Sequence, residues 1–117
     1  MATINDVLAQ VDELKPNAYS EEVKAGWLLE LEGRLAVEVL EGVPPTSDAS
    51  YDAPLLVPPP FDNLYVLYAG AMVDYWNQEF DNYANGMVMF NQALEEYRKW
   101  YQRAHRPERA GTFQNVV

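Results

Sequence analysis

The side chains that could take part in chemistry are few, and their spacing forms no recognisable reaction centre. The only histidine, His105, lies at an expected helix end beside Arg103 and Arg106, whereas a catalytic or metal role would need carboxylates or further histidines nearby. We favour an interaction of His105 with the helix dipole. The sequence contains no cysteine, no glycine-rich phosphate loop and no nucleophile elbow. We therefore predict no catalytic, cofactor-binding or metal-ligating residue, and expect that the protein is not an enzyme.

Carboxylates and aromatic rings offer two further kinds of chemistry. Glu30 and Glu38 flank Arg34 at steps of four residues, which is typical of a solvated, salt-bridged helix face. A carboxylate metal site on helices would require Glu-x-x-His pairs, and the sequence has none. Tyrosines and tryptophans could stack on nucleobases, but most of them lie in the acidic part of the chain, where cations are scarce. We expect them to pack in the core and at protein interfaces instead.

The charge of the chain is strongly negative and unevenly distributed. The formal net charge is −10, which argues against a general nucleic-acid binder, because affinity for the phosphate backbone depends on clustered cations. Residues 98–117 hold five Arg and Lys against one Glu, a net charge of +4, whereas the first 97 residues hold three against 17 Asp and Glu, a net charge of −14. Two interpretations stay open: unlike surfaces of two molecules could meet head to tail, or the cations could stabilise the last turn of a helix.

The second half of the chain contains a regularly spaced row of apolar residues, which we call the apolar seam. The helices that carry this seam would position the aromatic and charged side chains described above. Its members are Val66, Ala69, Val73, Trp76, Phe80, Tyr83, Met87, Phe90, Leu94, Tyr97 and Tyr101. Alternating steps of three and four residues place them on one face of helical backbone. The polar interval at residues 77–82 predicts two helices, 61–77 and 81–105, because one small domain could not cover so long a seam. A single helix of about 60 Å would satisfy the same spacing.

Two shorter helices are predicted before the seam. Thr3 and Asp6 form an approximate capping box for a helix over residues 4–14. Ser20 caps a second helix over residues 20–41, which is apolar along two stripes. The second stripe contains Gly26, Leu29, Gly33, Val37 and Leu40. A helix that is apolar on most sides is buried on most sides, and a neighbouring subunit could supply the second cover.

The connection over residues 43–60 breaks the helical pattern. It contains six of the eight prolines of the chain, and connections of this length without helix are usually functional or disordered. Its apolar residues argue against a purely solvated linker. These residues are Tyr51, Leu55, Leu56 and Val57. We expect Leu55–Val57 to be an extended segment that docks on its own domain or on a neighbour, and we favour its own domain.

These elements predict an all-α protein, a compact four-helix bundle with a Pro-rich extended connection. We expect a single helical domain over residues 1–106 and a flexible tail over residues 107–117. The sequence shows neither a signal peptide nor an apolar run of the roughly 18 residues that a membrane span needs.

The order of elements over residues 3–105 carries a family resemblance. A capped short helix precedes a Ser-Glu-Glu helix with an early Trp. A connection ending in Leu-Leu-Val-Pro-Pro-Pro then leads into Phe-Asp-Asn-Leu-Tyr and a Tyr- and Trp-rich last helix. The most telling residues are Tyr83, Asn85, Met89, Phe90 and Asn91. This pattern resembles the small head–tail connector proteins, or adaptors, of tailed bacteriophages.

The resemblance implies a structural subunit that forms a ring, commonly of twelve copies, below the portal, where it extends the DNA channel and supports tail attachment. The implied partners are other copies, the portal and tail proteins, with no cofactor, no sequence-specific nucleic acid and no membrane. The implied location is the virion, or the host cytoplasm during assembly. The candidate interface residues are Tyr51, Leu55, Leu56, Val57, Arg98, Arg103, Arg106, Arg109, Phe113, Val116 and Val117. The alternative is a small acidic helical regulator of phage or bacterial origin that binds a protein.

Overall fold

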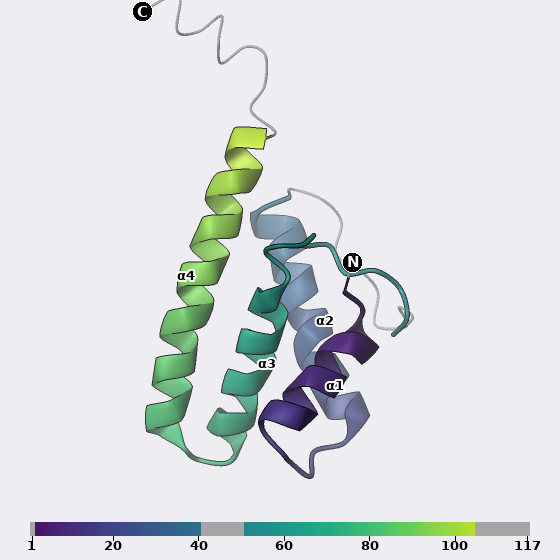
Figure 1. Cartoon of the computed structure of the whole chain (residues 1–117), viewed down its shortest axis with the longest axis vertical. Helices are drawn as coiled ribbons and strands as arrows, with labels where there is room; N and C mark the ends of the chain where they lie inside the picture. The colour runs from purple at the N-terminus through teal and green to yellow at the C-terminus, as the bar shows by residue number, and fades with distance from the viewer. Residues whose placement is uncertain (1, 41–50, 105–117) are drawn as a thin grey trace, which may run out of the picture.

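The computed structural model describes residues 2–40 and 51–104, and within them the protein is all-α (Figure 1). The helices are α1 (Ile4–Leu14), α2 (Glu21–Glu38), α3 (Asn63–Trp76) and α4 (Phe80–Ala104). The predicted all-α four-helix fold is confirmed. In the described ranges, extended pairing is limited to a single isolated bridge between Thr3 and Pro54.

The first two helices begin at the residues that the sequence predicts. The Thr3 hydroxyl accepts a hydrogen bond from the Asp6 amide, and the Asp6 carboxylate accepts one from the Thr3 amide, both at 3.2 Å. The Ser20 hydroxyl accepts a hydrogen bond from the Val23 amide at 3.1 Å. These caps satisfy amides that have no partner within the helix, so they fix where each helix starts.

Helix α2 ends at Glu38, three residues before the predicted end. The amides of Val39 and Leu40 both donate to the Leu35 carbonyl, at 3.0 and 3.1 Å. Leu40 thereby bonds five residues back instead of four, which interrupts the regular α-helical ladder. Residues 41–50, which include the last residue of the predicted range, lie outside the described residues.

The predicted break between α3 and α4 is confirmed. Gln78 has a φ of 63°, a left-handed conformation that the interior of an α-helix does not accommodate. The Gln78 amide donates to the Tyr75 carbonyl, and the Glu79 amide donates to the Asp74 carbonyl. The chain therefore reverses over residues 77–79, and α4 returns antiparallel to α3 (Figure 1). The alternative of one long helix is excluded.

Helix α3 lies at the centre of the molecule. It contacts α1, α2 and α4, whereas α4 packs on α3 alone among the described helices. Of the 25 residues of α4, only Phe90 and Tyr97 are fully buried. Gly86 allows a close approach here, because an added Cβ would lie 3.2 Å from the Ala71 Cβ. Helix α4 is therefore covered along one face and extends beyond the other helices at its C-terminal end (Figure 1).

The extended segment before α3 completes the core. The Leu55 amide donates to the Ala2 carbonyl at 2.8 Å, and the Asn5 amide donates to the Tyr51 carbonyl at 3.2 Å. The side chains of Leu55 and Val57 are buried within the chain. In the described part of the predicted connection, residues 55–57 thus dock on their own domain.

Candidate interaction surfaces

Neither a cluster of metal-ligating side chains nor a membrane-spanning helix occurs in the described part of the chain. It contains no group of three or more His, Cys, Asp or Glu side chains that could hold a metal ion. Among the helices of residues 2–40 and 51–104, none combines the length and the apolar character that crossing a membrane requires. The features that remain are a buried polar cluster and three exposed surfaces.

The buried polar cluster joins α2, α3 and the extended segment. The Tyr65 hydroxyl donates to Glu32 Oε1, while the Leu56 amide donates to Glu32 Oε2 at 2.9 Å. The Val57 amide in turn donates to the Tyr65 hydroxyl at 2.9 Å. The side chains of Glu32 and Tyr65 are almost fully buried. We call this arrangement the polar latch, since it fastens the extended segment to two helices.

The electrostatics of the polar latch follow from its burial. Burial raises the pKa of Glu32, and the hydrogen bonds from Tyr65 and Leu56 oppose that rise. Burial also raises the pKa of the Tyr65 hydroxyl, and the neighbouring carboxylate raises it further. The hydroxyl therefore stays protonated and acts as a donor. Every acceptor and donor in the latch is used by the protein itself, so the arrangement is structural.

An apolar groove runs over α3 between the end of α1 and the first half of α4. Its volume is about 280 Å³. Its lining residues are Val11, Leu14, Lys15, Val66, Leu67, Gly70, Ala71, Asp74, Asn82, Asn85, Gly86 and Met89. Leu14 and Met89 on its rim are 70% and 56% exposed. Within the groove, Lys15 Nζ and Asp74 Oδ2 form an ion pair at 2.9 Å.

The second surface, which we call the aromatic tip, consists of Tyr75, Trp76, Phe80 and Tyr83 at the α3–α4 turn. The Tyr75 ring lies 5.3 Å from Trp76, 5.8 Å from Phe80 and 5.1 Å from Tyr83 between centroids. Trp76 and Phe80 are each 55% exposed. Both residues belong to the apolar seam, so the described residues leave this part of the seam uncovered. The chain reverses between the two rings, at residues 77–79.

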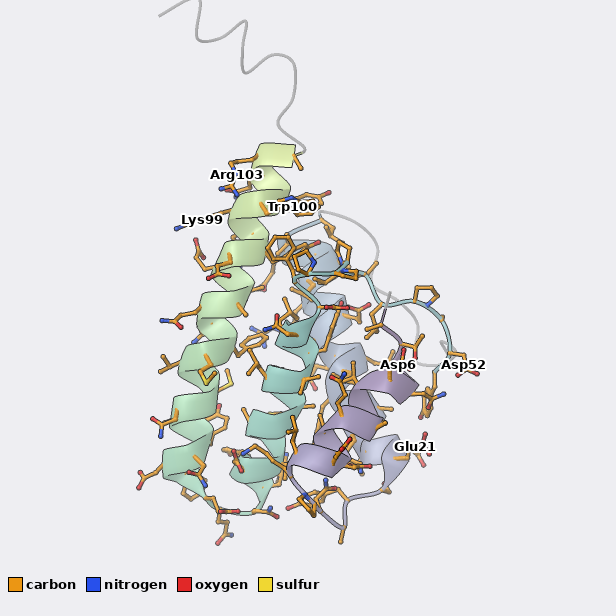
Figure 2. All side chains as sticks on the ribbon, in the orientation of Figure 1. Asp6, Glu21, Asp52, Lys99, Trp100 and Arg103 are labelled. Atoms are coloured by element: carbon orange, nitrogen blue, oxygen red, sulfur yellow. The ribbon has the colours of Figure 1, made fainter. Side chains whose placement is uncertain are left out.

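The third surface, which we call the basic end, consists of Arg98, Lys99 and Arg103 on the last turns of α4. Lys99 and Arg103 are exposed, and Figure 2 shows both at the end of α4 that lies far from the α3–α4 turn. Trp100 projects toward the bundle (Figure 2), where its ring lies 5.2 Å from Phe61. Lys99 and Arg103 therefore occupy the outer face of the helix.

The predicted interface residues fall into three groups. Leu55 and Val57 are in the core, and Tyr51 packs partly buried against it, so Leu56 is the residue of this segment that stays exposed. Arg103 is exposed, whereas Arg98 is half-buried and its Nε has no hydrogen-bond partner among the described residues. The remaining candidates lie outside the described residues. They are Arg106, Arg109, Phe113, Val116 and Val117.

Sequence reasoning missed the polar latch and the apolar groove. Glu32 follows Leu28 by four residues and precedes Leu35 by three, so the spacing that places those leucines in the core also places Glu32 there. That spacing is the signal that could have identified it. The groove has no comparable signal, because its lining comes from three helices. Comparison of the chain with protein-family models, curated proteins and solved structures finds no match.

Proposed function

We propose that this protein is a structural assembly subunit of the phage head–tail connector type, which forms a ring below the portal, extends the DNA channel and supports tail attachment. The proposal rests on the sequence resemblance and on one structural observation. A single chain fills its core and still exposes clustered apolar side chains at the aromatic tip and along the groove rim. Clustered exposure of this kind is typical of surfaces that meet another protein.

The second apolar stripe of α2 gives further support to the proposed assembly role, because part of it stays exposed. Val37 on this stripe is 55% exposed. At Gly26, an added Cβ would meet nothing within 4 Å, so this glycine makes no close helix contact with the part of the chain that the structure describes. A neighbouring subunit would supply the missing cover in a ring.

The charge distribution is compatible with the same role. In the described residues, the cations that precede α4 are engaged within the fold. Lys15 pairs with Asp74, Lys24 pairs with Asp12 at 2.6 Å, and Arg34 interacts with the Tyr68 hydroxyl. The outer surface before the basic end is therefore dominated by carboxylates. An acidic channel wall would let DNA slide without sticking, because like charges repel.

The test is assembly on a portal ring. The portal protein encoded nearest to this gene is purified as a ring and mixed with the subunit, and the mixture is analysed by size-exclusion chromatography with light scattering. We expect retention of the subunit in a stoichiometry that matches the portal symmetry. A portal that neither retains the subunit nor changes its oligomeric state would overturn the proposal. A one-to-one complex with a basic host protein would instead support the regulator.

A further inference from the structure

We infer that the aromatic tip of one copy receives the basic end of α4 from a second copy, in a head-to-tail contact between unlike surfaces. The inference names the subunit contact behind the proposed assembly role, and it rests on that role for its purpose. It combines four observations: exposed rings, a rigid turn, carboxylates beside the rings that form no ion pair within the described residues, and exposed cations at the opposite end of the same helix.

The rings of the tip form a continuous apolar surface. Tyr75 touches all three of its aromatic neighbours, so the four rings act as one patch. Tyr75 is 40% exposed even at the centre of these contacts. Aromatic side chains bury large areas and are enriched at the centre of protein interfaces. Covering this patch would therefore release more apolar surface from water than covering scattered single residues.

The turn that presents the rings is held in place from both sides. The Tyr19 hydroxyl donates to Asn77 Oδ1 at 2.8 Å, which ties the turn to the α1–α2 connection. Asp74, one residue before Tyr75, is fixed by its ion pair with Lys15. The Tyr83 amide donates to the Glu79 carbonyl at 2.9 Å and starts α4. A pre-organised surface loses little conformational freedom when a partner binds.

The tip carries negative charge without a local counterion. Glu79 and Asp81 flank Phe80 in the sequence and are exposed. Neither forms an ion pair within the described residues, and the nearby cation Lys15 is engaged with Asp74. Carboxylates beside electron-rich ring faces favour a cationic ligand, because the carboxylate and the ring quadrupole both attract positive charge.

The basic end supplies that ligand. Lys99 and Arg103 are four residues apart and share one face of α4, and no ion pair within the described ranges involves either of them. Glu95, one turn before Lys99, is not paired with it there. In Figure 2 both cations point away from α3, so a second molecule can reach them.

One chain cannot bring its own two surfaces together. They lie at opposite ends of α4, whose 25 residues span roughly 37 Å. The contact must therefore join two copies through different surfaces. A heterologous contact of this kind closes into a ring when the rotation between copies permits it, and otherwise continues as a filament.

The test is a charge exchange in the full-length protein. One variant reverses the tip (Glu79→Lys with Asp81→Lys), and the other reverses the basic end (Lys99→Glu with Arg103→Glu). Self-association is measured by analytical ultracentrifugation up to millimolar protein in about 0.1 M salt, where the Debye length of about 10 Å leaves local contacts dominant. We expect the wild type to self-associate and each variant alone to associate at least about tenfold more weakly, because like charges then meet. An equimolar mixture should regain association, since every contact in it pairs unlike charges.

Two controls keep the outcome specific. Glu21→Lys with Glu38→Lys makes the same charge change as the tip variant at exposed positions of α2 and should associate as the wild type does. Trp76→Gln with Phe80→Gln removes apolar surface but leaves every charge in place, and it should weaken association while circular dichroism stays unchanged. This variant decides the matter if a charge-reversed chain fails to fold.

Several results would overturn the inference: a wild type that stays monomeric over the whole range, a mixture no better than its components, an equal loss in the α2 control, or unchanged association of the aromatic variant. The experiment contains no portal. If the charge exchange fails but the portal retains the subunit, this contact is overturned and the proposed function stands. If the charge exchange succeeds but the portal does not retain the subunit, the contact stands and the proposed function is overturned.

Discussion

The polar latch and the aromatic tip place their side chains in opposite environments. In the latch, a carboxylate and a phenol are buried, and each makes hydrogen bonds within the chain. At the tip, Trp76 and Phe80 are more than half exposed. A buried carboxylate without hydrogen bonds is costly, so the hydrogen bonds to Glu32 indicate a closely defined packing of the core. The exposed rings are therefore not a sign of loose packing, and the tip is available for a partner.

The largest contrast is expected between two phenylalanines of α4. Phe90 is 3% exposed and packs against Tyr68 at 5.1 Å between centroids, whereas Phe80 is 55% exposed. Phe90→Ala should lower the free energy of unfolding by about 3–5 kcal/mol, because it removes buried apolar surface and leaves a cavity. Phe80→Ala should cost less than about 1 kcal/mol in the monomer. Urea unfolding followed by circular dichroism measures both, and equal losses would show that the tip belongs to the core.

The next largest difference in stability is expected between removing the buried hydroxyl of Tyr65 and removing the hydroxyl of the half-exposed Tyr83. Tyr65→Phe removes the group that bridges Glu32 and the Val57 amide, and should cost about 2 kcal/mol because a buried amide then lacks its acceptor. Tyr83→Phe, at the tip, keeps the ring contact with Tyr75 and should change stability by less than about 0.5 kcal/mol. The same urea titrations test this pair, and a Tyr65→Phe variant as stable as the wild type would contradict the structural role of the latch.

How well the sequence predicts this fold depends on whether the decisive signal is local. The start of α1 follows from Thr3 and Asp6, whose capping box forms within a few residues of the helix start. The break at residues 77–79 follows from a polar interval in an otherwise apolar pattern. Each signal is complete within one short stretch of chain, so the predicted helix starts agree with the structure to within about two residues.

The missed features depend on residues distant in the sequence. Periodicity indicates which face of a helix is apolar, but not whether another element covers that face. Trp76 and Phe80 lie where none of the described elements does. Glu32 meets a tyrosine 33 residues away. The groove is formed by three helices. Such features become visible only when the packing of α1, α3 and α4 is known.

The latch also predicts a dependence of stability on pH. The pKa of Glu32 is raised in the folded protein above its ordinary value of 4.5. At pH values between the unfolded and the folded pKa, the folded chain therefore binds more protons at Glu32 than the unfolded chain does. The stability that Glu32 contributes is therefore complete below the unfolded pKa and is lost as pH rises through the folded pKa. Glu32→Gln keeps an acceptor for the Leu56 amide but cannot titrate.

Urea titrations of the wild type and Glu32→Gln, made at pH values from below 4.5 to above it, isolate the contribution of Glu32 to stability. The difference in unfolding free energy between the two proteins should shift in favour of Glu32→Gln as pH rises above 4.5. The remaining carboxylates titrate in both proteins, so their contribution cancels in the difference. A constant difference over the whole range would mean that Glu32 titrates alike in the folded and unfolded chains.

The smallest effect compares two glycines in helices of different surroundings. An added Cβ at Gly26 meets nothing within 4 Å, whereas one at Gly86 lies 3.2 Å from the Ala71 Cβ. Gly26→Ala should stabilise the monomer by roughly 0.5–1 kcal/mol, because alanine favours the helix and restricts the unfolded chain. At Gly86 the same gain is offset by crowding between α3 and α4, so Gly86→Ala should be neutral or destabilising. Thermal unfolding of both variants tests the order, and a larger gain at Gly86 would mean that α4 moves away from α3 at little cost, contrary to the close helix contact that positions the aromatic tip.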